Sequence, residues 1–96
     1  MNFEWDEAKR KTNLSKHGLD FGDATLVFSE ATFTFIDDRF DYEEDRFITL
    51  GILRGEIVVI AHTEREKAIW VISMRKATKN EQKLYYREFT NRLGTD

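Results

Sequence analysis

Residues 72–82 read ISMRKATKNEQ. This stretch predicts the end of a buried strand followed directly by the start of a helix. The continuous apolar run 68–74 is typical of a strand in the middle of a sheet. Thr78 and Glu81 have the spacing of a capping box, in which each side chain bonds the backbone N–H of the other residue. The pattern predicts a last helix from Thr78 to about Arg92. Its side toward the sheet should carry Leu84, Tyr85 and Phe89.

Three further strands are predicted upstream of this stretch. They cover residues 32–37, 46–53 and 56–62. Arg54-Gly55 is a short connection of the hairpin kind between the last two strands. Residues 37–45 hold six acids in nine positions, and we interpret them as a solvated hairpin loop. Residues 63–67 are expected to form another polar turn before the strand 68–74.

The N-terminal third predicts one short strand and two helices. Phe3-Glu4-Trp5 alternates like a strand, and Asp6 is suited to cap a helix over residues 7–16. Gly18 follows that helix and can adopt the positive φ of a helix end. A second helix is predicted from about residue 19 to residue 29.

This order of elements predicts an α+β fold, with helices against one four-stranded antiparallel sheet. The length of 96 residues suits a single domain, residues 1–96, because a chain this short can barely bury one core. There is no Cys, so disulfides and thiolate metal sites are excluded. The N-terminus lacks the basic and apolar regions of an export signal, and no apolar run approaches a membrane span. We therefore expect a cytoplasmic domain.

The net charge of −3 hides an asymmetry along the chain. Residues 20–64 carry eleven acids and three bases, a balance of −8. Residues 65–92 carry eight bases and three acids, a balance of +5. A basic C-terminal third beside an acidic middle suggests a face for an anion. Charge alone leaves an ordinary mixed surface as an equal alternative.

Both histidines stand at predicted element ends. Lys16 and His17 end the first helix, where they are either a functional pair or a plain C-terminal cap, since a cation is stabilised there by the helix dipole. His62 and Arg65 lie where a strand runs out into a loop, from which side chains can face a substrate. A buried core histidine is an equal interpretation of His62.

Arg75 and Lys76 directly follow the buried strand. Adjacent residues of a strand face opposite ways, so one of the two is expected on an open face of the sheet. Arginine can hold a phosphate by a two-pronged contact, and lysine adds a point charge. Lys79 and Lys83 would extend the patch by one helical turn. Arg75 is the sharpest candidate, because the strand before it and the capped helix after it set its backbone.

Other candidates are weaker. Trp5 and Tyr86 could stack bases, although plain core packing is the commoner use of such a tryptophan. Two isolated histidines among scattered acids do not form a three-ligand metal pattern. The acidic range 37–45 lacks the spacing of a calcium loop. We predict no metal and no cofactor.

Several motifs together resemble the BrnT family of bacterial ribonuclease toxins. They are FEWD (3–6), NLSKHG (13–18), Phe21, Ala24, Val27-Phe28, Arg46, Gly51, HTER (62–65), ISMRKA (72–77), Glu81 and Tyr85. The series covers nearly the whole chain in the right order. Met74 stands where the family usually has Ala, and Trp70 stands where a basic residue is common.

The resemblance implies a fold like the RelE ribonuclease toxins, endoribonuclease activity without a metal, and neutralisation by a BrnA-like ribbon-helix-helix antitoxin. The ribose 2′-hydroxyl would attack the neighbouring phosphate, with help from a base, an acid and positive charge. The positions that match the family suggest candidates for these roles. We expect proton transfer by His17 or His62, phosphate contacts by Lys16, Arg65 and Arg75, and contacts to flanking RNA by Trp5, Lys76 and Lys79.

A second hypothesis is a non-catalytic module that binds the antitoxin and co-represses a promoter. The toxin would then reach operator DNA only through the antitoxin, in a hetero-oligomer. A net charge of −3 disfavours direct tight binding to nucleic acid, because neutralisation of phosphates is the main source of that affinity. The same net charge is compatible with a toxin that binds one RNA segment through a local basic patch.

Overall fold

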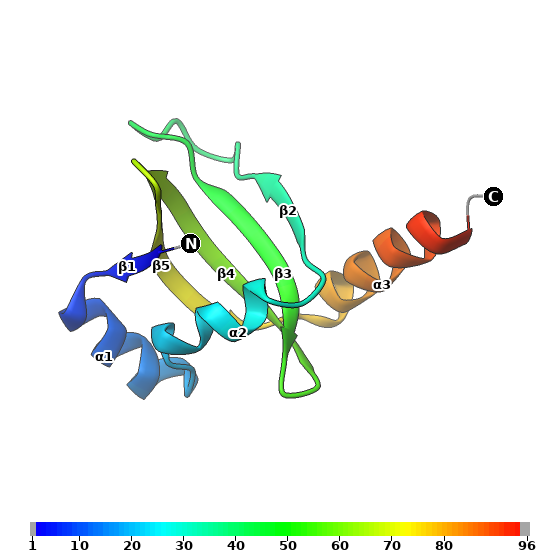
Figure 1. Cartoon of the computed structure of the whole chain (residues 1–96), viewed down its shortest axis with the longest axis horizontal. Helices are drawn as coiled ribbons and strands as arrows, with labels where there is room; N and C mark the ends of the chain where they lie inside the picture. Colours follow the sequence, from blue (N-terminus) through cyan, green and yellow to red (C-terminus); the bar gives the residue numbers. More distant parts are fainter. Residues whose placement is uncertain (1, 95–96) are drawn as a thin grey trace.

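The computed structural model describes the backbone of residues 2–94 and the side chains of residues 2–90 (Figure 1). A five-stranded sheet is packed against helices on both faces and at one edge. The elements in chain order are β1 (Asn2–Trp5), α1 (Glu7–His17), a 3-10 turn (Phe21–Asp23), α2 (Ala24–Phe28), β2 (Phe33–Ile36), β3 (Phe47–Leu53), β4 (Glu56–Arg65), β5 (Ala68–Lys76) and α3 (Lys79–Gly94).

The sheet has the strand order β1-β5-β4-β3-β2. Strands β2 to β5 are antiparallel neighbours, as predicted. The predicted four-stranded antiparallel sheet is nevertheless incomplete, because β1 joins it in parallel to β5. Asn2 lies opposite Ala68 and Trp5 opposite Val71. A four-residue strand does not reveal its partner in sequence, and β1 takes the edge of β5 that β4 leaves free.

Helix α1 begins and ends as predicted. The Asp6 carboxylate accepts a hydrogen bond from the Lys9 backbone N–H at 3.1 Å, which caps the first turn. Gly18 has a φ of 72° and donates its N–H to the Leu14 carbonyl, which closes the last turn. The second predicted helix is shorter than expected. Asp20 caps a tight 3-10 turn instead, and α2 starts only at Ala24.

Asn13 of α1 covers the edge of β5 beyond the end of β1. Its amide accepts from the Met74 backbone N–H at 3.2 Å and donates to the Met74 carbonyl at 2.9 Å. A second donation at 3.1 Å reaches the Leu19 carbonyl. The side chain is buried and takes the place of a strand partner for one residue. It therefore positions the last turn of α1 beside β5.

One face of the sheet packs on α2. Phe21, Ala24 and Val27 are fully buried there against β3, β4 and β5. A Cβ atom added at Gly51 would lie 2.6 Å from Val27 Cγ1, so only glycine lets α2 approach β3 this closely. The opposite face, called the open face below, carries Leu50 and Val59.

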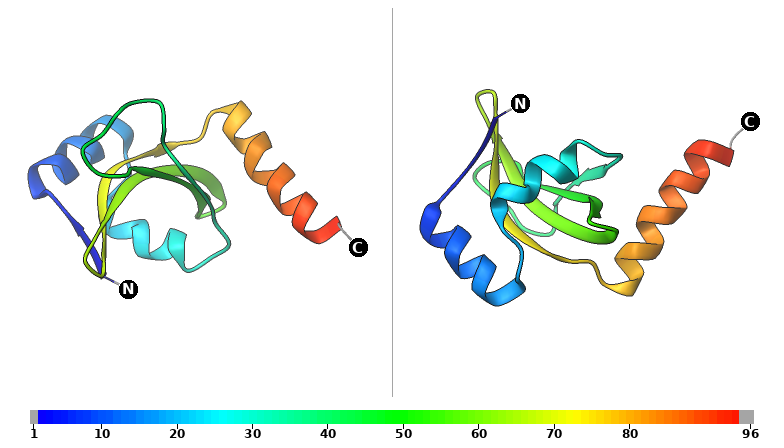
Figure 2. Two further views of the ribbon diagram at one scale, coloured as in Figure 1. Left: turned by 90° about the horizontal axis from the view of Figure 1, so that it is seen from above. Right: turned by 60° about the horizontal axis from the view of Figure 1, so that its bottom comes forward.

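Helix α3 covers one end of the open face. Glu81 N donates to Thr78 Oγ1 at 3.2 Å and Thr78 N donates to Glu81 Oε1 at 2.9 Å, which confirms the capping box. Tyr85 is buried on the open face, with Leu84 and Phe89 packed beside it, as predicted. Figure 2 shows α3 running away from the sheet, so the rest of this face is left to other elements.

Pairing extends the central strands beyond their predicted ends. The predicted polar turn 63–67 shrinks to the two residues between β4 and β5, because Thr63 pairs with Trp70 and Arg65 with Ala68. Strand β5 also continues to Lys76. Polar residues join strands when a neighbour satisfies their backbone groups, and sequence polarity alone does not reveal this.

The acidic segment 37–46 is not a purely solvated loop, and it lies on the opposite side of the sheet from α2 (Figure 2). Asp37 is buried and accepts hydrogen bonds from Arg39 and from the Tyr42 hydroxyl. These contacts lower the pKa of Asp37 to about 2, and the hydrogen bond from the Arg39 guanidinium contributes most. Hydrogen bonds to the buried Asp37 therefore hold the N-terminal end of the segment in place.

Candidate functional site

A groove follows β5 between α1 and the segment 37–46. It consists of two neighbouring pockets of about 330 and 290 Å³, which share Lys9 and Ile72 in their lining. The first pocket is lined by Ala8, Lys9, Thr12, Asn13, Lys16, His17, Ile72 and Ser73. The second is lined by Lys9, Tyr42, Glu43, Glu44, Arg46, Thr63, Arg65, Trp70 and Ile72. We call the two pockets together the β5 groove.

A β-bulge in β5 shapes the middle of this groove. Ala61 pairs with Ser73 and His62 pairs with Val71, so Ile72 is an extra residue on β5. A bulge of this kind bends the strand and changes the direction of its side chains. Ile72 consequently lines both pockets, and Ser73 lines the first.

Lys16 and His17 lie together in the first pocket. They are the last residues of α1, which the Gly18 cap and the Asn13 contacts hold against β5. The His17 side chain is half-buried and Lys16 is exposed. The structure therefore brings an imidazole and an ammonium group together in the lining of one pocket.

Arg65 lies in the second pocket, at the end of β4. Its guanidinium stacks over the Trp70 ring at 4.4 Å from the centroid and donates to a Glu44 carboxylate oxygen at 2.8 Å. About half of each charged side chain is exposed, 48% for Arg65 and 47% for Glu44. An exposed ion pair of this kind contributes little stability, so an anionic ligand can replace the carboxylate.

Arg46 repeats this arrangement on the other side of the second pocket. Its guanidinium lies 4.2 Å from the centroid of the Tyr42 ring. Together the groove holds four cationic side chains, Lys9, Lys16, Arg46 and Arg65, and two carboxylates, Glu43 and Glu44. Flat guanidinium and aromatic groups beside lysines are the side chains that contact single-stranded nucleic acid.

Arg75 lies outside the groove. Its side chain makes two hydrogen bonds of 2.8 Å to the Glu81 carboxylate, so its two-pronged grip is already used within the protein. The Arg75 guanidinium holds the pKa of Glu81 at about 2. Arg75 and Glu81 line a separate pocket of about 190 Å³ with Asp37 and Arg39. In the structure, the anion bound by Arg75 is therefore the Glu81 carboxylate.

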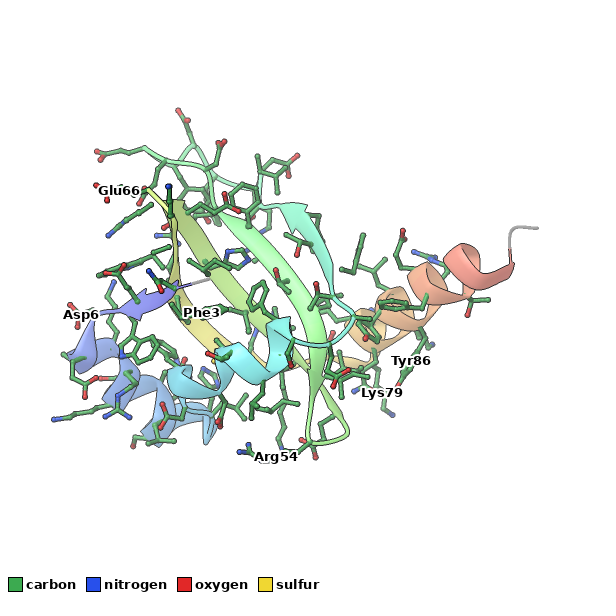
Figure 3. All side chains as sticks on the ribbon, viewed as in Figure 1. Phe3, Asp6, Arg54, Glu66, Lys79 and Tyr86 are labelled. Atoms are coloured by element: carbon green, nitrogen blue, oxygen red, sulfur yellow. The ribbon has the colours of Figure 1, made fainter. Side chains whose placement is uncertain are left out.

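The remaining cations of the predicted patch also lie away from the groove. Lys76 forms an exposed ion pair with Glu56 at 3.2 Å. Lys79 and Tyr86 lie on α3, at the side of the molecule remote from Glu66 of the β4–β5 turn (Figure 3). The structure thus separates Arg65 from Lys79, which the basic C-terminal third suggested as one patch. Arg65 lies six positions along β4 from Val59, the partner of Arg75, which corresponds to roughly 20 Å.

Trp5 packs against the hydrophobic core, so its ring is not positioned to stack on a base of RNA. Its ring packs edge-on against Phe21, with centroids 6.4 Å apart, and its Nε1 donates to Glu7 at 3.2 Å. Trp70 is the tryptophan that lines the groove. The structure therefore supports plain packing for Trp5, the alternative given above.

His62 is a core residue, and the expectation that it faces a substrate is corrected. Only 2% of it is exposed, and its ring lies between Phe28 and Phe47 on the α2 face. Its Nε2 and Thr49 Oγ1 are hydrogen-bonded at 2.7 Å. Burial lowers the pKa of His62 to about 4. The ring is therefore neutral at pH 7, and strand pairing beyond residue 62 is the reason it lies inside.

The buried ring makes folding stability depend on pH. Between pH 6.5 and 4 the unfolded chain binds a proton at His62 that the folded protein does not. The free energy of unfolding should therefore fall as pH drops from 7 to 5, with a slope approaching about 1.4 kcal/mol per pH unit. Urea titrations at pH 7, 6 and 5 measure this slope. His62→Gln keeps a hydrogen bond to Thr49 without a titrating ring and should flatten it, whereas an equal slope in both proteins would contradict the assignment.

Sequence reasoning missed several groove residues. Lys9 carries no pattern that separates it from an ordinary helix position. Thr63 and Arg46 stand at positions that match the BrnT family, but nothing in the sequence gave either side chain a role. Tyr42 belongs to the acidic segment, whose composition drew attention to its carboxylates. Trp70 had one available signal, its departure from the basic residue common at that position of the BrnT family.

The fold and the groove together define a small α+β domain with cations and flat rings along β5, an arrangement suited to an extended anionic chain. The chain belongs to the family of BrnT ribonuclease toxins of type II toxin–antitoxin systems, whose family model matches residues 5–81. Membership implies an antitoxin partner. Among curated proteins, no sequence matches the chain.

Within residues 2–94, no three His, Asp or Glu side chains are grouped so that they could hold a metal ion. Over the same residues, no helix has both the length and the apolar character needed to cross a membrane.

Proposed function

We propose that this protein is a cytoplasmic endoribonuclease that cleaves RNA bound along the β5 groove and needs no metal ion. A BrnA-like ribbon-helix-helix antitoxin would neutralise it in a hetero-oligomer. One observation carries the proposal: every residue that lines the groove lies within residues 5–81, the range that matches the ribonuclease family. The groove also combines an imidazole with cations, the groups that such chemistry requires.

The proposed reaction is an attack of the ribose 2′-oxygen on the adjacent phosphorus. The new P–O2′ bond forms as the P–O5′ bond breaks, which leaves a 2′,3′-cyclic phosphate and a free 5′-hydroxyl. A base takes the proton of the 2′-hydroxyl, and an acid gives a proton to the departing 5′-oxygen. Negative charge develops on the non-bridging oxygens, where fixed cations stabilise the transition state.

His17 carries one of the two proton transfers in this proposal, because imidazole can accept and donate a proton near neutral pH. Lys16 and Lys9 flank it and contact the phosphates. Arg65 turns from Glu44 to the reacting phosphate. Arg75 has a secondary role, because its two-pronged contact is already made to Glu81 and a phosphate would have to displace that carboxylate to take it over.

A second candidate function is antitoxin binding and co-repression without catalysis. Internal ion pairs favour it, because Arg65, Arg75 and Lys76 each pair with a carboxylate of the protein itself. Such pairing weakens the attraction for RNA. Operator DNA would then be reached only through the antitoxin.

Incubation of the purified protein with total RNA, with and without excess EDTA, tests the proposal. We expect the same degradation in both samples, and loss of it when a purified BrnA-like partner is added. Activity that the chelator abolishes and a divalent ion restores would contradict the metal-independent mechanism. Stable binding of the partner with no RNA cleavage under any condition would favour the second candidate.

A further inference from the structure

Thr63 has a buried hydroxyl without a hydrogen-bond partner, and the residue lines the second pocket of the groove. The residue is 2% exposed, and its Oγ1 makes no hydrogen bond within the protein. Among the described side chains, His62 Nδ1 is the other buried polar atom in this state. Buried hydroxyls are normally bonded, because an unmade bond destabilises the fold. Thr63 lines the second pocket, so a ligand there can supply the missing bond.

The pocket that Thr63 lines contains two arginine side chains, each stacked on an aromatic ring. Trp70 is the partner of Thr63 on β5, and Arg65 stacks on that ring at 4.4 Å. On the β3 side, Phe47 pairs with His62, so Arg46 precedes the residue paired next to Thr63, and its guanidinium stacks on the Tyr42 ring. Two guanidinium–ring pairs therefore line the same pocket as Thr63.

We infer that the second pocket binds a nucleobase of the RNA, with Thr63 Oγ1 hydrogen-bonded to the edge of the base. The inference rests on the proposed function and adds a base-reading subsite to it. The base takes the place of the Arg65 guanidinium on the Trp70 ring. Arg65 is then free to contact the neighbouring phosphate, and its exposed pair with Glu44 is the contact that opens.

A nucleobase fits this pocket better than a second phosphate does. Glu43 and Glu44 line the pocket and repel an anion, but their oxygens can accept hydrogen bonds from a base. Stacking on aromatic rings and guanidinium planes is the usual way in which proteins hold an unstacked base. A threonine hydroxyl can donate or accept, which suits the mixed edge of a base.

Short 2′-O-methyl oligonucleotides that differ at one base test the subsite, because they lack the attacking hydroxyl and cannot be cleaved. Their affinities are measured for the wild type, Thr63→Val and Thr63→Ser. We expect the wild type to discriminate among the four bases at one position. Thr63→Val should reduce this discrimination at least fivefold, and Thr63→Ser should keep it. The thermal midpoint of Thr63→Val should stay equal or rise, because the valine removes an unbonded hydroxyl.

Arg65→Ala serves as the matched control for a phosphate contact. It should weaken all four oligonucleotides about equally, because phosphate contacts carry no base information. Unchanged discrimination in Thr63→Val would overturn the subsite, as would its loss in Thr63→Ser or a clear fall in the thermal midpoint of Thr63→Val. None of these results depends on cleavage. The proposed function fails separately, if the wild type leaves cleavable RNA intact.

Discussion

Arg65→Ala is expected to lower the rate of RNA cleavage by about a hundredfold or more, the usual cost of removing one charged contact to the transition state. The Trp70 ring holds the guanidinium in the second pocket before any ligand arrives. When RNA binds, the guanidinium leaves this ring for the phosphate, and the variant removes that charged contact. Arg65→Lys should recover little, because an ammonium group can neither stack as a plane nor grip with two prongs. Single-turnover cleavage of a defined RNA measures the effect.

Arg54→Ala is the matched control for this variant. Arg54 is also an exposed arginine in an ion pair, with Asp23 at 3.2 Å, but it lies at the β3–β4 hairpin, far from Glu66 (Figure 3), and it lines neither pocket of the groove. It should cleave RNA at the wild-type rate. Both variants should unfold within a few tenths to about 1 kcal/mol of the wild type, because exposed ion pairs contribute little. Equal activity in the two variants would remove Arg65 from the site.

The same contact can be tested from its other end. Glu44→Gln frees Arg65 from its carboxylate, whereas Glu43→Gln removes an equal charge from the same pocket and leaves the Arg65–Glu44 pair in place. Both changes reduce repulsion of RNA. Glu44→Gln should strengthen binding a few-fold more than Glu43→Gln, within the range of about 0.2–1 kcal/mol for an exposed pair. Identical behaviour of the two variants would show that Glu44 does not compete with the substrate for Arg65.

The sequence predicted local structure well where the signal is local. The capping box of Thr78 and Glu81 depends on residues three apart, and the Asp6 and Gly18 ends of α1 are equally short-range. Hydrophobic runs likewise identified β3, β4 and β5. The pairing of β1 with β5 could not be predicted in this way, because the two strands are more than sixty residues apart in the chain.

The site was harder to predict because a charge acts through its neighbours in space. Arg75 follows a buried strand as expected, yet its partner is Glu81, the residue assigned only to the cap. The Glu81 carboxylate both caps the helix and binds Arg75, and no spacing rule in the sequence indicates the contact with Arg75. Lys16, His17 and Arg65 were candidates from sequence, but their common groove depends on the bulge at Ile72. The decisive contacts of the site are therefore tertiary.

His17→Ala is expected to reduce RNA cleavage by about 10²–10⁴-fold, the usual contribution of a positioned acid or base. The loss should appear in the cleavage step, while affinity for an uncleavable 2′-O-methyl RNA changes little. The fold should survive, because Asn13 and the Gly18 backbone hold this end of α1 without the imidazole. His17→Gln should remain inactive, because an amide can hydrogen-bond but cannot transfer a proton.

Added imidazole distinguishes proton transfer from mere packing. It should partly restore cleavage by His17→Ala, because the first pocket of about 330 Å³ is open enough to admit a small ring in place of the lost side chain. It should not restore His17→Gln, whose side chain still fills that space. His62→Gln removes the other histidine from the core and, where it folds, should cleave like the wild type. A folded His17→Ala protein with full activity would assign proton transfer elsewhere in the groove, and Lys16, its neighbour on the same pocket wall, would then be the group to test.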